Sequence, residues 1–173
     1  MISRKRLSQP ALVRARTVVG TNDRVRLGCI GIGYRGVQNL FAFTAHKDAQ
    51  IACLCDVYEP YLNGEFDKIH PHFKKLGYVV PSRLPELKAS VQHYADFRRV
   101  LDQKDLDAVI IATPDYWHAT QTIMACDAGK DVYIEKALSF PLCEGRRMVE
   151  AVSLFYALAR LRSAGPRGLF TPP

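Results

Sequence analysis

Short apolar runs alternate along the middle of the chain with segments that carry apolar residues at helical spacing. The runs predict β-strands, which cover residues 25–30, 50–55, 91–94, 107–112 and 131–135. The fourth run is continuously apolar after its first residue, as expected of a parallel strand that helices cover on both faces.

Helices are predicted between these strands and after the last one. They cover residues 37–46, 59–76 with a break at Pro71, 96–101, 118–128 and 144–161. Gly129 would cap the fourth helix. Residues 77–85 are expected to be irregular because they contain one glycine and two prolines. The alternation of strands and helices predicts an α/β fold with a doubly wound parallel sheet.

The length of 173 residues fits one ordinary domain. We expect a basic, irregular segment at 1–23, the folded domain at 24–152 and a divergent tail at 153–173. No stretch approaches the roughly eighteen apolar residues of a membrane span, so no membrane contact is expected.

The net charge of +7 comes from the two ends of the chain. Ten of the 24 Lys and Arg residues lie before Asp23 or after Gly145, and the sequence between them is slightly acidic. A nucleic-acid-binding domain needs a basic face on its folded part. We therefore interpret the ends as solvated and expect no nucleic-acid partner.

The five cysteines include no CxxC pair, and their odd number favours a reducing compartment. The basic residues 4–6 are not followed by the long apolar segment of a secretory signal. We expect a cytoplasmic location, with export through a degenerate leader left open. Neither the cysteines nor the pair of His70 and His72 has the spacing of a metal site, so no metal is expected.

Gly31, Gly33 and Gly36 form a GxGxxG turn between the first predicted strand and the first helix. The first glycine permits a tight turn, the second lets the backbone approach a pyrophosphate, and the third lets the helix pack close to the sheet. The helix N-terminus offers free N–H groups to the phosphates, so Tyr34 and Arg35 also count as cofactor-binding residues. The motif predicts a dinucleotide site; a glycine-rich turn without a ligand is the alternative.

Asp56 lies at the end of the second predicted strand, at the distance from the glycines that dinucleotide sites show. A carboxylate there accepts hydrogen bonds from the adenosine ribose and repels a 2′-phosphate. The next residue is Val57, where an NADP site can place an arginine. We therefore expect NAD as the cofactor, with NADP less favoured; a turn-capping role for Asp56 is the alternative.

Two further polar segments, Thr113–His118 and Glu135–Lys136, follow later strands. Both would border a ligand, because ligands bind beyond the carboxyl ends of the strands in an open parallel sheet. His118 could donate a hydrogen bond or a proton near a nicotinamide, and Lys136 could hydrogen-bond a substrate hydroxyl as hydride leaves. The alternatives are a histidine that pairs only with nearby backbone and a solvated Glu–Lys surface pair.

In their order and spacing, these motifs resemble the Gfo/Idh/MocA family of NAD(P)-dependent oxidoreductases. The resemblance runs through the stretches DRVRLGCIGIGYRG, ACLCDVY, DAVIIATPDYWHA, ACDAGKDVYIEK and EGRRMVEA. It implies a Rossmann fold and hydride transfer to or from a sugar-like or polyol-like substrate. Some relatives use NAD as retaining glycosidases, and the sequence does not separate the two outcomes.

The resemblance also implies roles for individual residues. The cofactor-binding residues would be Gly31, Gly33, Tyr34, Arg35, Gly36, Asp56, Thr113, Pro114, His118, Glu135 and Lys136. Thr113, Pro114 and His118 would line the nicotinamide side. Glu135 and Lys136 begin the family's EKP motif, whose lysine helps to bind cofactor and substrate. Lys136 and His118 are the expected catalytic residues.

The chain departs from the family in two places. Ala137 stands where the EKP motif has its proline, so the backbone beside the lysine is less constrained. After Val152 the family continues into a sixth strand and a substrate domain, whereas this chain has an Arg-, Gly- and Pro-rich tail. We therefore expect an incomplete Rossmann domain whose open sheet edge or face favours self-association. A non-catalytic NAD-binding module, or an inert truncated fragment, is the alternative to an enzyme that a partner or a further segment completes.

Overall fold

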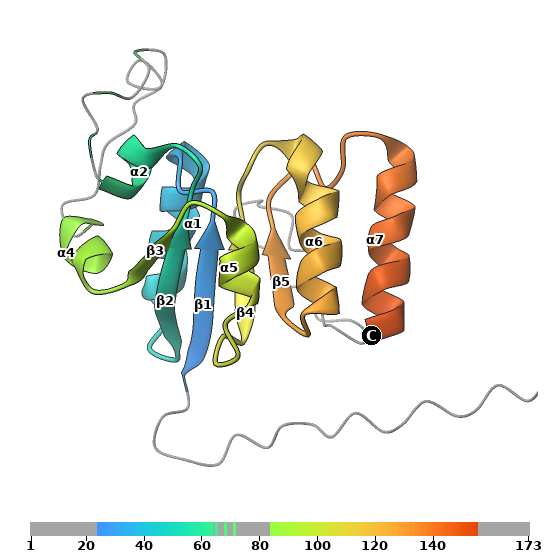
Figure 1. The fold of residues 1–173 in the computed structure, drawn as a ribbon, viewed down its shortest axis with the longest axis horizontal. Helices are drawn as coiled ribbons and strands as arrows, with labels where there is room; N and C mark the ends of the chain where they lie inside the picture. Colours follow the sequence, from blue (N-terminus) through green and yellow to red (C-terminus); the bar gives the residue numbers. More distant parts are fainter. Residues whose placement is uncertain (1–23, 64, 66–67, 69–70, 72–83, 156–173) are drawn as a thin grey trace, which may run out of the picture.

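A computed structural model describes residues 24–63, 65, 68, 71 and 84–155, which form a five-stranded parallel sheet with helices on both faces (Figure 1). The strands are β1 (Val25–Ile30), β2 (Ala49–Cys55), β3 (Gln92–Tyr94), β4 (Ala108–Ile111) and β5 (Asp131–Ile134). Their order across the sheet is β3-β2-β1-β4-β5, and every neighbouring pair is parallel. This order confirms the predicted doubly wound fold of the Rossmann type.

Helices connect the strands and cover the sheet. They are α1 (Tyr34–Thr44), α2 (Glu59–Asn63), α4 (Leu84–Ala89), α5 (Phe97–Leu101), α6 (His118–Asp127) and α7 (Leu142–Phe155), with a short 3-10 turn, η2, at Asp115–Trp117. In Figure 1, α5 and α6 lie in front of the sheet and α1 lies behind it. Helix α7 packs beside α6.

The two faces of the sheet carry separate apolar clusters. Leu27 and Cys29 of β1 belong to the cluster that includes residues of α1 and α2, whereas Ile30 belongs to the cluster with residues of α5, α6 and α7. A Cβ atom at Gly28 would lie 2.7 Å from Cγ1 of Val100. Because Gly28 has no side chain, α5 can pack closely against β1.

Most element boundaries lie close to the predicted ones, with two exceptions. Helix α1 begins three residues early, at Tyr34, because it winds directly from the glycine turn. The prediction that residues 77–85 are irregular is wrong at its end, since α4 begins at Leu84. Pro85 is compatible with this helix because N–H groups of a first turn need no acceptor within the helix.

Several predictions concern residues outside the described part of the chain. These are the segments 1–23 and 156–173, the histidines His70 and His72, and most of the predicted helix 59–76 beyond α2. Within the described residues, α7 follows β5 without a sixth strand, so β3 and β5 form the edges of the described sheet.

Gly129 ends α6 in the predicted capping position. Its φ is +70°, and the N–H groups of Gly129 and Lys130 donate to carbonyls in the last turn of the helix. This turn buries Lys130, whose Nζ donates to the carbonyls of Gln103 (2.6 Å) and Leu106 (2.8 Å). The lysine therefore ties the end of α6 to the loop that enters β4.

Buried thiols give the fold a pH dependence. Burial raises the pKa of Cys53 to about 11 and that of Cys55 to about 12, with the charge of Asp56 adding to the second shift. These thiols therefore stabilise the fold below the unfolded-state pKa, near 9, and the contribution is lost as the pH rises toward 11 and 12. We expect the free energy of unfolding in urea to fall in this range, and to fall less steeply in a Cys55→Ala variant.

The same burial sets the reactivity of the cysteines. Four of the five are buried and Cys143 is exposed. At neutral pH, iodoacetamide should modify Cys143 alone in the folded chain and all five cysteines in denaturant. Modification of the buried thiols without denaturant would contradict this account.

Candidate functional site

Four loops meet at the carboxyl ends of the parallel strands. They are the glycine turn after β1, the loop at Asp56 after β2, the loop at Thr113 after β4 and the loop at Lys136 after β5. Strand β1 lies between β2 and β4, so the direction of winding reverses there, and such a reversal opens the crevice in which α/β proteins bind ligands. The structure thus brings the predicted segments of the site to one edge of the sheet.

The three glycines of the turn are under different steric constraints. Gly31 has a φ of +83°, and a Cβ atom there would lie 2.8 Å from backbone atoms of the loop after β4. At Gly36 a Cβ atom would lie only 1.9 Å from the carbonyl oxygen of Gly31. At Gly33 the nearest atoms are those of the Tyr61 side chain, at 3.3 Å and beyond. Gly31 and Gly36 are therefore required by the fold, whereas a Cβ atom at Gly33, where α1 begins, would meet only the flexible side chain of Tyr61.

Asp56 links the loop after β2 to the glycine turn. Its Oδ2 accepts a hydrogen bond from the Ile32 N–H (2.8 Å), and its Oδ1 accepts one from the Tyr58 N–H (2.9 Å). The side chain therefore caps a turn, the alternative considered from the sequence, while it stands beside the glycines.

Tyr61 is a residue of this region that sequence reasoning missed. Its ring lies over Gly33 and meets the ring of Tyr58 edge to face, with centroids 5.0 Å apart. Burial, together with the nearby charge of Asp56, raises the pKa of the Tyr61 phenol. The sequence signal is an aromatic residue early in the helix after Asp56, but such a residue fits a core position equally well.

Glu135 is buried, with 3% of its surface exposed, so it is not part of a solvated Glu–Lys pair. Its Oε1 accepts a hydrogen bond from Asn39 Nδ2 (2.9 Å) and lies 3.0 Å from Arg35 Nε. Its Oε2 accepts the N–H of Lys136 (3.3 Å). The carboxylate therefore holds α1, with the adjoining glycine turn, against the end of β5. Asn39 is a second residue that sequence reasoning missed.

Replacing Glu135 by alanine should destabilise the domain by about 2–3 kcal/mol, because Arg35 and Asn39 would lose a buried acceptor. Glu135→Gln keeps an acceptor oxygen for Asn39 and should lose less stability. Urea denaturation followed by circular dichroism measures both effects. Equal stability of the two variants would show that the carboxylate oxygens are not the groups that matter.

The remaining predicted residues follow β4 and β5. Pro114 and Lys136 have exposed side chains, and Thr113 is half-buried, with its Oγ1 donating to Gln121 Oε1 (2.7 Å). Lys136 therefore stands at the surface of the edge where ligands bind, with its backbone fixed by Glu135.

His118 is buried, with 1% of its surface exposed, although it begins a helix at this edge. Its Nδ1 lies 2.6 Å from the carbonyl oxygen of Ala137, and its Nε2 lies 2.9 Å from that of Thr113. The two contacts of the ring are those of a histidine that pairs with backbone, the alternative considered from the sequence. The peptide bond between Lys136 and Ala137 is cis.

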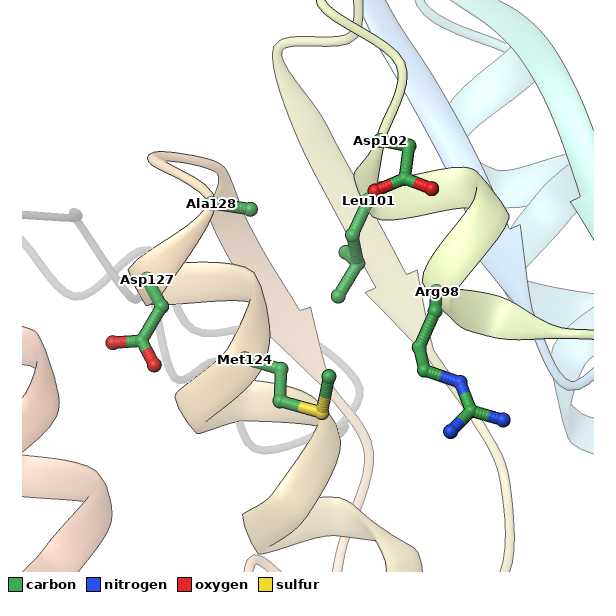
Figure 2. A pocket seen from close by; sticks show the side chains of 6 residues that line it. All are labelled: Arg98, Leu101, Asp102, Met124, Asp127 and Ala128. Atoms are coloured by element: carbon green, nitrogen blue, oxygen red, sulfur yellow. The ribbon is translucent and has the colours of Figure 1, made fainter.

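A cavity of about 270 Å³ lies elsewhere in the molecule, between α5 and α6 (Figure 2). Its lining residues are Arg98, Leu101, Asp102, Met124, Asp127 and Ala128. Most of them belong to the C-terminal ends of the two helices, which lie toward the amino ends of the strands. The cavity is therefore separate from the crevice at the carboxyl ends.

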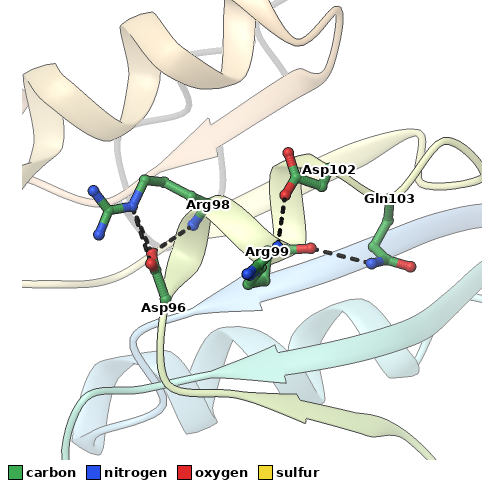
Figure 3. A network of polar contacts seen from close by, with 5 residues as sticks. All are labelled: Asp96, Arg98, Arg99, Asp102 and Gln103. Carbon is green, nitrogen blue, oxygen red and sulfur yellow. Dashed lines mark hydrogen bonds and ion pairs between the residues drawn. The ribbon is translucent and has the colours of Figure 1, made fainter.

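Two charged residues that line this cavity, Arg98 and Asp102, form ion pairs with neighbouring residues of α5 and its cap (Figure 3). Asp96 caps α5 by accepting the Arg98 N–H (3.0 Å), and it also accepts the Arg98 Nε–H (2.9 Å). These hydrogen bonds hold the pKa of Asp96 below its usual value. Arg99 forms an ion pair with Asp102 at 3.8 Å. The network stabilises a short helix and does not point to a ligand.

In the part of the chain that the structure describes, no three His, Cys, Asp or Glu side chains gather as ligands for an ion, and no helix has the length and hydropathy of a bilayer span.

The chain matches a known protein family over most of its described length. The model of the oxidoreductase family with an NAD-binding Rossmann fold matches residues 25–153. A glycosyl hydrolase family 109 protein of Shewanella baltica is 27% identical over 128 residues, which make up 74% of this chain and 26% of that protein. The chain thus spans about a quarter of the length of the curated relatives it matches.

Solved structures share the fold. The scyllo-inositol dehydrogenase of Lactobacillus casei, with bound NAD(H) and scyllo-inositol, gives a TM-score of 0.62 at 20% identity, over 82% of this chain and 36% of that chain. The WlbA dehydrogenase of Bordetella pertussis, in complex with NADH and UDP-GlcNAcA, gives a TM-score of 0.60 at 22% identity, over 77% and 35% of the respective chains.

Proposed function

The chain belongs to the Gfo/Idh/MocA family of oxidoreductases, and on that premise we propose that its crevice binds NAD and forms the cofactor half of a sugar or polyol oxidoreductase. The observation that carries the proposal is the pairing of the Gly33 backbone, at the start of α1, with the carboxylate of Asp56 on the neighbouring loop, whose Oδ2 accepts the N–H of Ile32 in the glycine turn. The chemistry that NAD supplies when bound is the acceptance or return of a hydride.

The glycine turn would hold the pyrophosphate. Gly33 leaves room for phosphate oxygens to approach the backbone, and the N–H groups of Tyr34 and Arg35 lie in the first turn of α1, where N–H groups lack acceptors within the helix. The positive end of the helix dipole adds to their attraction for an anion.

The carboxylate of Asp56 would accept hydrogen bonds from the hydroxyl groups of the adenosine ribose. A 2′-phosphate placed against this carboxylate would be repelled, and the following residue, Val57, is apolar and 90% exposed. NAD is therefore favoured over NADP.

Lys136 is the proposed catalytic residue, with Thr113 and Pro114 lining the nicotinamide side. Its ammonium group would donate a hydrogen bond to the substrate oxygen and stabilise the negative charge that forms there when the hydroxyl proton is lost to water, before the hydride leaves carbon. The backbone of the lysine is positioned by Glu135, which accepts its N–H.

Hydride transfer is tested by incubating the purified chain with NAD and a panel of sugars and polyols while NADH formation is followed. Turnover that is lost in Lys136→Ala, with cofactor binding retained, supports the proposal. Binding of NADH without turnover on any substrate favours a non-catalytic NAD-binding module, or an inert fragment, over an enzyme.

A second candidate is an NAD-dependent glycosidase, favoured by the similarity to glycosyl hydrolase family 109 proteins. Release of an aryl leaving group from aryl glycosides, only when NAD is present, would support this function. Release that does not depend on NAD would argue against it.

We also propose a cytoplasmic location, because the buried thiols of Cys53 and Cys55 suit a reducing compartment.

We further propose that the chain associates with a second copy of itself through the edge of the sheet at β5. Near β5 the apolar side chains of Leu138, Phe140 and Leu142 are exposed. Sedimentation of the chain and of a Phe140→Ser variant tests the association: a dimer that the substitution weakens is expected, and a monomer contradicts it.

A further inference from the structure

The side chain of His118 joins two loops of the site that are far apart in the sequence. One ring nitrogen lies 2.9 Å from the carbonyl oxygen of Thr113, in the loop after β4, and the other lies 2.6 Å from that of Ala137, in the loop after β5. Both loops stand at the carboxyl ends of adjacent parallel strands. The imidazole therefore spans the wall of the crevice from one loop to the other.

The surroundings of the ring exclude direct contact with a ligand. The side chain is 1% exposed, and both of its nitrogen atoms face backbone carbonyls. A neutral imidazole donates one hydrogen bond and an imidazolium donates two, so the ring holds one or both carbonyls according to its protonation. Neither form presents a nitrogen to a substrate.

The groups that His118 holds are those next to the proposed nicotinamide site. Thr113 is fixed at its carbonyl by the imidazole and at its hydroxyl by Gln121 (2.7 Å). Ala137 follows Lys136, so a bond to the Ala137 carbonyl fixes the backbone on one side of the lysine, while Glu135 accepts its N–H on the other.

We infer that His118 is a positioning residue: it fixes the Thr113 and Lys136–Ala137 loops at the spacing that receives the nicotinamide half of the cofactor. The inference rests on the proposed NAD-binding function. It gives His118 a role that acts through Thr113 and Lys136, in place of a proton donor to substrate.

Three substitutions separate the two contacts of the ring. His118→Asn places an amide nitrogen near the position of Nδ1, toward Ala137, and His118→Gln places one near Nε2, toward Thr113. His118→Leu fills the space with neither donor. Affinity for NADH and for ADP-ribose, which lacks the nicotinamide, is measured by calorimetry on the full chain after circular dichroism has verified the fold.

His118→Leu should weaken NADH binding about fivefold, the ratio that a hydrogen bond of about 1 kcal/mol represents, and leave ADP-ribose binding unchanged. The Asn and Gln variants should fall between it and the unmodified chain. Equal losses for both ligands would overturn the inference in favour of a general structural role, and so would unchanged NADH binding in His118→Leu. If every variant binds NADH and ADP-ribose with the affinities of the unmodified chain, the inference is overturned and the proposed NAD site stands. If the unmodified chain binds neither ligand, the proposed function and this inference are refuted together.

A measurement on the unmodified chain guards against variants that do not fold. With ¹⁵N-labelled histidine, a buried ring N–H that donates to a carbonyl gives a proton resonance that exchanges slowly with water. We expect such a resonance from His118 without any ligand. A His118 ring whose N–H protons exchange as fast as those of exposed histidines would overturn the inference.

Discussion

Replacing Gly36 by alanine should prevent α1 from packing against the sheet, at a cost of about 3 kcal/mol or more in the free energy of unfolding. The added Cβ atom would lie 1.9 Å from the carbonyl oxygen of Gly31 and 2.8 Å from its carbonyl carbon. These are backbone atoms, and Gly31 is itself confined by the loop after β4, at 2.8 Å from its own Cβ position. Neither the start of α1 nor the Gly31 backbone can move away without displacing the end of a strand. Urea denaturation followed by circular dichroism measures the loss.

Gly129→Ala is the matched control for this substitution. Gly129 has a positive φ, of +70°, which Gly36 in α1 does not share, but a Cβ atom at Gly129 would meet nothing within 4 Å. Its replacement should cost only the conformational penalty of about 1 kcal/mol. If Gly36→Ala were as stable as Gly129→Ala, the close packing of α1 on the glycine turn would be contradicted.

Replacing Gly33 by alanine should leave the fold intact and lower the affinity for NADH at least about tenfold. The only neighbours of the added methyl group are atoms of the Tyr61 ring, the nearest at 3.3 Å, and this side chain can yield by a few tenths of an ångström. The methyl group would lie on the Gly33 backbone at the start of α1, where the pyrophosphate is proposed to approach. Fluorescence titration with NADH gives the affinity, and urea denaturation verifies the fold.

Gly145→Ala controls for the effect of adding a methyl group near a helix start. Its Cβ atom would also meet one flexible side chain, Ser139, at 3.3 Å. Gly145→Ala should change neither the equilibrium constant of unfolding nor the affinity for NADH by more than about twofold. Unchanged NADH affinity in Gly33→Ala would place the pyrophosphate somewhere other than the glycine turn.

The parts of the fold that the sequence predicts well are those fixed by local pattern. Strand β1 has its predicted bounds because its apolar run ends at the glycines of the turn. The sequence predicted that Asp56 lies at the end of β2 because this residue follows the second apolar run directly. Helix α4 was missed because Pro85 is compatible with a first helical turn as well as with a loop.

The contacts that the sequence could not predict join distant segments. Glu135 was predicted to bind the cofactor, with a solvated Glu–Lys pair as the alternative, and it is buried because Asn39 and Arg35, on α1, supply its partners. His118 was expected to face the ligand, and its ring lies between two carbonyls, one of them in the loop after β5. A pattern of single residues shows which side chains reach the edge of the sheet, and tertiary packing decides which of them are covered there.

The most direct test of the account is a fluorescence titration of the folded chain with NADH and then with NADPH, repeated with Asp56→Ala and Asp56→Asn. Asp56→Asn retains an acceptor oxygen for the N–H of Ile32 or Tyr58 and controls for distortion of the turn. NADH should bind more tightly than NADPH, and Asp56→Ala should lose NADH binding. Because Asp56→Asn removes the negative charge, it should narrow the difference between the affinities for NADH and for NADPH. A folded chain that binds neither cofactor, or that binds NADH equally well without Asp56, would contradict the assignment of this crevice as an NAD site.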